Sequence, residues 1–136
     1  MIHALSMVLI IDEDHFSNST LSLAIRKLGL SRNVVCTTSS SKGLAYLHKQ
    51  KTNNYPFPEL IFYNPSTRGV LPNEFMDSYR NHFESEFDTK LVLLEDKTER
   101  VSMKYEPNVT AVIKKPVSMG KLLRVFNGQA IHELIG

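Results

Sequence analysis

Hydrophobic residues in this chain fall into five short continuous runs, separated by longer stretches in which apolar residues recur every three or four positions. Each run is about as long as a strand and is rich in Val, Ile, Leu or aromatic residues. A strand that is apolar without alternation is buried on both faces, as in a parallel sheet covered by helices. The predicted strands are Met7–Ile11, Asn33–Thr37, Leu60–Tyr63, Leu91–Leu94 and Val109–Ile113.

The stretches between the runs predict amphipathic helices, because their apolar residues return to one helical face. Gly29 stands where the first helix is expected to end. Ser39 to Ser41 and Ser118 are candidate N-caps, and Pro72 suits the entry of a helix. The apolar positions of the five predicted helices are Leu21, Ala24, Ile25 and Leu28; Leu44, Tyr46 and Leu47; Phe75, Met76, Tyr79 and Phe83; Val101 and Tyr105; and Met119, Leu122, Leu123 and Phe126.

Strand and helix thus alternate five times, which predicts an α/β fold with a doubly wound parallel sheet between two helical layers. The 136 residues are enough for one compact domain. We expect residues 1–128 to form that domain. Residues 129–136 are expected to form a C-terminal tail or an extension of the last helix, and residues 49–58 a surface loop.

Composition narrows the function classes. The net charge is +2, from 16 basic and 14 acidic residues, which does not indicate a nucleic-acid binder. The apolar start lacks a basic region and leads directly into acidic residues, so it predicts neither a signal peptide nor a membrane span, and favours a cytoplasmic protein. The single cysteine, Cys36, excludes an internal disulfide and is expected in the core. No phosphate-binding or dinucleotide-binding glycine motif is present.

Polar residues follow four of the predicted strands. Because ligands of open α/β sheets bind at the carboxyl ends of the strands, these residues are candidates for a common site. They are Asp12 and Glu13 after the first strand, Asn64 after the third, Glu95 and Asp96 after the fourth, and Lys114, Lys115 and Pro116 after the fifth.

Three of these segments, Val8–Asp14, Pro58–Asn64 and Ile113–Pro116, resemble the receiver domain of two-component response regulators. The resemblance covers about residues 5–127. It implies a flavodoxin-like (βα)5 fold with three α/β/α layers. It also implies a pocket in which a sensor histidine kinase transfers a phosphoryl group to an aspartate, a reaction that depends on positioning and electrostatics.

The resemblance assigns roles to four residues that match the receiver pattern. Asp12 and Glu13 hold the acidic-pair positions, and hard carboxylate oxygens suit Mg²⁺. Ser66 holds the position whose backbone carbonyl completes the metal shell. Lys115 holds the position of the phosphoryl-binding lysine. Mg²⁺ is therefore the candidate cofactor, with Asp12, Glu13 and Ser66 as weak candidate ligands.

Other positions depart from the pattern. Asn64 replaces the phosphoacceptor aspartate, and a neutral amide oxygen is a poor nucleophile. Glu95 replaces the serine or threonine that donates to a phosphoryl oxygen, and a carboxylate there repels that oxygen. Arg68 and Pro72 replace the usual Pro and Gly of the loop. Val112 replaces an often aromatic switch residue. Together these differences predict a receiver that is no longer controlled by phosphorylation.

Loss of the charge at Asn64 leaves Lys115 without its usual carboxylate partner. We expect Glu95 to supply that carboxylate from the neighbouring strand. A Glu95–Lys115 pair of this kind would hold the pocket in one fixed state.

The leading hypothesis is a degenerate receiver that has no enzymatic activity and acts as a phosphorylation-independent interaction module. Its expected partner is a sensor histidine kinase or other signalling protein, with neither nucleic acid nor membrane bound. A homodimer through the face of the fourth helix, fifth strand and fifth helix is a further expectation. One alternative is a conventional receiver that is phosphorylated elsewhere, or in which Asn64 is an artefact. A weaker alternative is a small flavodoxin-like cofactor binder.

Overall fold

Five parallel strands form a single sheet in the computed structural model, which describes residues 4–96 and 109–127. The strand order is β2-β1-β3-β4-β5. The strands are β1 (Val8–Ile11), β2 (Val34–Thr37), β3 (Leu60–Tyr63), β4 (Lys90–Glu95) and β5 (Val109–Lys114). Since the order reverses between β1 and β3, a crevice opens at their carboxyl ends. The flavodoxin-like prediction is confirmed.

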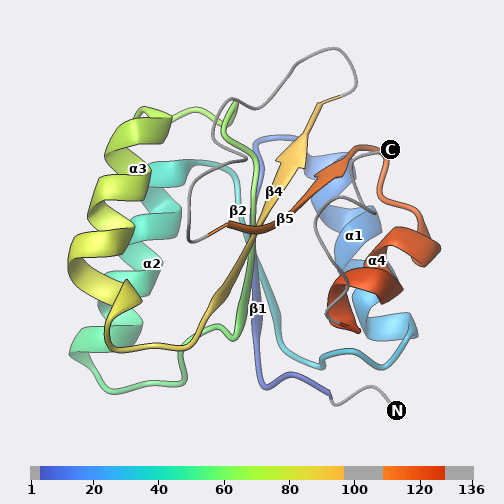
Figure 1. Ribbon diagram of the computed structural model, residues 1–136, viewed down its shortest axis with the longest axis horizontal. Helices are drawn as coiled ribbons and strands as arrows, with labels where there is room; N and C mark the ends of the chain where they lie inside the picture. Colours follow the sequence, from blue (N-terminus) through green and yellow to red (C-terminus); the bar gives the residue numbers. More distant parts are fainter. Residues whose placement is uncertain (1–3, 97–108, 128–136) are drawn as a thin grey trace.

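Helices cover both faces of the sheet and give three layers (Figure 1). The helices are α1 (His15–Lys27), α2 (Ser40–Thr52), α3 (Pro72–Tyr79) with its π-helical continuation η1 (Arg80–Glu84), and α4 (Met119–Phe126). The pair α2 and α3 lies on one face, and α1 and α4 lie on the other. The helix predicted around Val101 and Tyr105, and the predicted tail, fall outside the described residues.

Local sequence signals set the helix ends. Asp14, Ser39 and Ser118 are the N-caps of α1, α2 and α4, and each side chain accepts a backbone N–H of the first turn. Gly29 follows α1 with a φ of +69°, a conformation that costs glycine little. The predicted caps at Ser39 and Ser118 are therefore confirmed.

The core consists of two hydrophobic clusters, one on each side of the sheet. Side chains of one strand alternate between them, as Ile10 and Phe62 do on the α1 side and Ile11 and Tyr63 on the α2 side. Each fully buried apolar side chain stabilises the fold by about 1.5–3 kcal/mol relative to exposure. This rigid double-sided core fixes the strand ends, and with them the polar residues that follow.

Two local predictions were wrong. Cys36 is exposed rather than buried, because β2 is an edge strand with a neighbour on one side only. The loop expected over residues 49–58 begins only after Thr52, where α2 ends. The loop is anchored near its end by Gln50 of α2, whose side-chain amide donates to the carbonyl of Pro56 at 2.7 Å.

Candidate functional site

Asp12 is the most buried charged group at the carboxyl edge of the sheet, with 1% of its surface exposed. Its Oδ2 accepts from Lys115 Nζ at 2.7 Å and from the Ser17 hydroxyl at 3.3 Å. Its Oδ1 accepts from the backbone N–H of Asp14 at 3.0 Å. Its backbone carbonyl accepts from the side-chain amide of Asn18 at 2.7 Å. Both carboxylate oxygens are thus engaged by the protein itself.

Lys115 lies between two carboxylates. Its Nζ is 2.7 Å from Asp12 Oδ2 and 3.2 Å from Asp96 Oδ1. Burial lowers the pKa of Lys115, but the hydrogen bonds and charges of Asp12 and Asp96 outweigh burial and leave the pKa above its ordinary value. The ammonium is therefore fully charged at neutral pH and joins the end of β1 to the end of β4.

Asn64 is buried at the end of β3, with 3% of its surface exposed. Its backbone N–H donates to the Ile11 carbonyl at 2.9 Å, which continues the β1–β3 pairing. Its side-chain Nδ2 donates to Asp96 Oδ1 at 3.2 Å, and its Oδ1 accepts from the backbone N–H of Ser66 at 3.0 Å. These contacts use the amide in both roles, as donor and as acceptor, and an ionised carboxylate could not replace the donor.

Asp96 is the site residue whose role the sequence prediction missed. One of its carboxylate oxygens, Oδ1, is shared between Lys115 Nζ and Asn64 Nδ2, at 3.2 Å in each case. It therefore places a negative charge beside the neutral amide of Asn64. The available signal was the pair of adjacent acids at positions 95 and 96, since successive residues of an extended chain point to opposite sides.

The expected Glu95–Lys115 pair was wrong. Within the described residues, Lys115 pairs with Asp12 and Asp96, whereas Glu95 Oε1 lies 3.8 Å from Lys114 Nζ. The physical reason is register: Glu95 and Lys114 are partners across β4 and β5, so their side chains share one face of the sheet. Residue 115 points to the other face. A backbone bond links the two positions, from the Lys115 N–H to the Glu95 carbonyl at 2.8 Å.

The loop after Asn64 is tied to its surroundings. Arg68 donates its backbone N–H to Glu13 Oε1 at 3.1 Å and accepts from the Ser40 N–H at 2.8 Å. Gly69 has a φ of +122°, and a Cβ there would lie 2.5 Å from Ser40 Oγ. Pro72 then opens α3. The backbone of this loop is therefore tied to Glu13 and to the first residue of α2.

These contacts do not match a preformed Mg²⁺ site. The described residues contain no group of three or more His, Cys, Asp or Glu side chains that could surround a metal ion. Among the expected positions, Asp12 is engaged by Lys115 and exposed Glu13 by the loop backbone. The Asn64 oxygen accepts from the backbone N–H of Ser66. Asp12 Oδ2 could therefore hold an ion directly only by sharing or losing its contact with the Lys115 ammonium.

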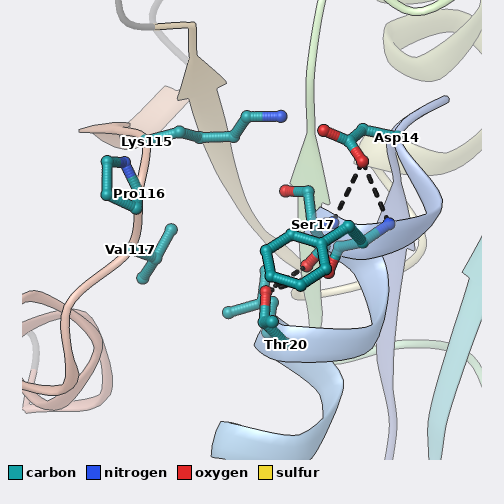
Figure 2. A pocket seen from close by; sticks show the side chains of 8 residues that line it. Asp14, Ser17, Thr20, Lys115, Pro116 and Val117 are labelled. Carbon is teal, nitrogen blue, oxygen red and sulfur yellow. Dashed lines mark hydrogen bonds between the residues drawn. The ribbon is translucent and has the colours of Figure 1, made fainter.

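A cavity of about 410 Å³ opens beside the Lys115 network, between α1 and the segment after β5 (Figure 2). Apolar surface dominates it, and Phe16 at its edge is 77% exposed. Its lining residues are Asp14, Phe16, Ser17, Thr20, Leu21, Lys115, Pro116 and Val117. The sequence prediction did not identify this groove, because exposed apolar residues do not stand out from the helical pattern.

The predicted dimer face is only partly described. Phe126 is half-buried on α4 and packs against the core, as expected. Tyr105 lies outside the described residues, and so the homodimer stays a prediction. None of the helices within residues 4–96 and 109–127 has the length and apolarity needed to cross a membrane.

Several solved structures that are similar to this chain are response regulator receivers. A two-component response regulator from Cytophaga hutchinsonii is similar with a TM-score of 0.79 and 19% identity, over 92% of this chain and 96% of that one. The bacteriophytochrome response regulator RtBRR is similar with a TM-score of 0.75 and 20% identity, over 91% of this chain and 77% of that one. A CheY-like receiver domain from Methylobacillus flagellatus is similar with a TM-score of 0.71 and 15% identity, over 91% of this chain and 98% of that one. No family model and no curated protein matches the chain. The chain therefore has the receiver fold.

Proposed function

We propose that the protein is a receiver domain of two-component signalling whose pocket no longer accepts a phosphoryl group, and that it acts by binding a partner protein. The receiver fold supports the first half of this proposal. The observation that carries the second half is the position of Asp96, which neutralises Lys115 and binds the amide of Asn64. In this reading the chain is a signalling module and has no enzymatic activity.

Phosphoryl transfer needs a nucleophilic oxygen and an electrostatic environment that gains from the incoming charge. Asn64 offers an amide oxygen that already accepts a hydrogen bond from Ser66. Lys115 is already shared between the carboxylates of Asp12 and Asp96. A phosphoryl group would bring two or so further negative charges beside Asp96. The pocket therefore disfavours phosphoryl transfer in two ways: it lacks a good nucleophile, and its negative charge repels the incoming group.

The same network removes the need for a metal ion. Mg²⁺ is held in proteins by carboxylates, and it keeps several waters. In this pocket the Lys115 ammonium takes the place of a cation at Asp12, with an Nζ–Oδ2 distance of 2.7 Å. We infer that the pocket is stable without Mg²⁺ and binds it only weakly.

The partner would bind at the groove between α1 and the segment after β5. Phe16, Thr20 and Leu23 recur at the spacing of one helical face, and Phe16 and Leu23 are 77% and 63% exposed. Phe16 and Thr20 line the cavity, and the exposed Phe16 ring with the mostly apolar cavity wall forms a surface of the kind that accepts the apolar face of a helix. Leu23 lies further along α1 and lines a separate cavity. We propose a helical segment of a sensor histidine kinase as the partner, since the receiver fold belongs to proteins of that system.

A beryllofluoride titration tests the pocket part of this proposal. Beryllofluoride with Mg²⁺ mimics an acyl phosphate, and its binding is followed by ¹⁹F NMR and by thermal stability. We expect no bound ¹⁹F signal and no change in melting temperature for the natural chain. A stoichiometric bound signal would overturn the proposal. A receiver that retains its aspartate serves as the positive control.

A further inference from the structure

We propose that His48 and His82 form a binding site for a divalent transition metal ion such as Zn²⁺, at the end of the molecule opposite the Lys115 network. His48 lies near the end of α2, and His82 lies in η1, the π-helical continuation of α3. Both elements end at the amino edge of the sheet, because each leads into the next strand. This site is independent of the proposed receiver function.

The two imidazole rings have the separation that a shared ion requires. Their ring centres are 5.1 Å apart, with 64° between the ring planes. Zinc–nitrogen bonds of about 2.0–2.1 Å in tetrahedral geometry place two imidazole centres roughly 5 Å apart around one ion. Both residues are exposed, so an ion and its waters can reach the rings without opening the core.

The two ligands are carried by a fixed framework. Phe83, next to His82, is fully buried, and its ring centre lies 4.8 Å from that of His48. Lys51, one turn after His48, donates to the His82 carbonyl at 2.6 Å. The π-helical turn adds a residue per turn to a regular helix, and such turns are frequent at functional sites. The backbone on both sides of the histidine pair is therefore held in place before any ion binds.

The local charges permit a cation. Lys51 is a cation beside the pair, and its Nζ is paired with Glu86 Oε1 at 3.0 Å, which offsets its repulsion. The described residues contain no third side-chain ligand. Water would therefore complete the shell, and Cu²⁺ would bind more tightly than Zn²⁺.

Zn²⁺ titration calorimetry on tag-free protein tests this site. All samples carry His3→Gln and His132→Gln, because these two histidines lie outside the described residues. We expect one Zn²⁺ per chain, with affinity at least tenfold weaker in His48→Gln and in His82→Gln. His15→Gln, an exposed histidine on α1, should bind as the parent does.

The melting temperature supplies a second measurement. Zn²⁺ should raise it in the parent, and EDTA should reverse the rise. Neither single variant should respond, and without metal each should melt as the parent does because both rings are exposed. Unchanged affinity in either variant, or no saturable binding up to about 1 mM Zn²⁺, would overturn the proposal.

Discussion

The carboxylate of Asp96 lies 3.2 Å from the ammonium nitrogen of Lys115, and the same oxygen accepts from the side-chain amide of Asn64. By its resemblance to receivers, the chain has Asn64 where a receiver pocket carries its aspartate. Here the negative charge comes instead from the residue after β4. The network therefore keeps Lys115 paired although Asn64 carries no charge.

Removal of the Lys115 ammonium should destabilise the fold. In Lys115→Met, the carboxylate of Asp12, which is 1% exposed, loses its 2.7 Å partner. Breaking a buried pair on one side costs about 3–5 kcal/mol, and partial exposure of Lys115 places this case near the lower end. Urea denaturation measures the free energy of unfolding. The control is Asp77→Asn, which removes an exposed pair with Arg80 and should cost less than about 1 kcal/mol.

Restoring the aspartate alone should not restore phosphorylation. In Asn64→Asp, a new carboxylate stands beside that of Asp96. Asp96 also loses the hydrogen bond that the Asn64 amide now donates to it. Like charges at this distance favour protonation or displacement of one group. We expect little phosphoryl adduct from this variant with Mg²⁺ and a small phosphodonor.

A further change should restore part of the reaction. Addition of Asp96→Ala to Asn64→Asp frees Lys115 to pair with the new carboxylate. The adduct, measured by intact mass, should increase from the single to the double variant. Full adduct formation by Asn64→Asp alone would show that Asp96 does not block the pocket.

Alkaline pH should weaken the fold above pH 10. Burial raises the pKa of Tyr79 from 10.0 to about 12, so folding favours its neutral form, and this stability is lost as the pH rises through that range. The pKa of Lys115 is likewise above its ordinary 10.5, so its contribution is present below that value and is lost above it. Denaturation between pH 9 and 12 should show the decline. Tyr79→Phe should reduce the slope, whereas Tyr55→Phe, on an exposed ring, should not.

Asn64 should resist conversion to aspartate. Deamidation usually begins when the backbone nitrogen of the next residue attacks the asparagine side chain, but the next residue is Pro65, whose nitrogen carries no hydrogen. The sequence Asn127-Gly128 has no such block. After mild alkaline incubation, peptide mapping should find deamidation at Asn127 and an intact Asn64. Equal rates at the two positions would contradict this chemistry.

The proposed groove predicts which side chain a kinase contacts. Phe16→Ala should weaken binding to the purified helical domain of a partner kinase at least tenfold, because it removes the most exposed large apolar side chain beside the cavity. Calorimetry against a panel of such domains provides the measurement. Tyr55→Ala, at 52% exposure beyond the end of α2, should bind as the natural chain does. Equal loss in both variants would place the partner elsewhere.

The sequence was sufficient to predict the five strands and the four described helices, since buried parallel strands must be apolar on both faces and helix caps need particular side chains. Leu60–Tyr63 was predicted with its observed bounds for that reason. The site was only partly predictable. Whether Glu95 or Asp96 faces Lys115 depends on which side of the sheet each residue meets, and register with β5 decides that. The exposure of Cys36 depended on the edge position of β2, which only the strand order reveals.

The central claim is that the Asp12–Lys115–Asp96 network occupies a pocket that takes no phosphoryl group. The most direct measurement is the intact mass of the natural chain after incubation with Mg²⁺ and a small phosphodonor such as acetyl phosphate, beside a receiver that retains its aspartate. The account predicts an unchanged mass for this protein while the control gains one phosphoryl group. A stoichiometric phosphoryl adduct on the natural chain would contradict it.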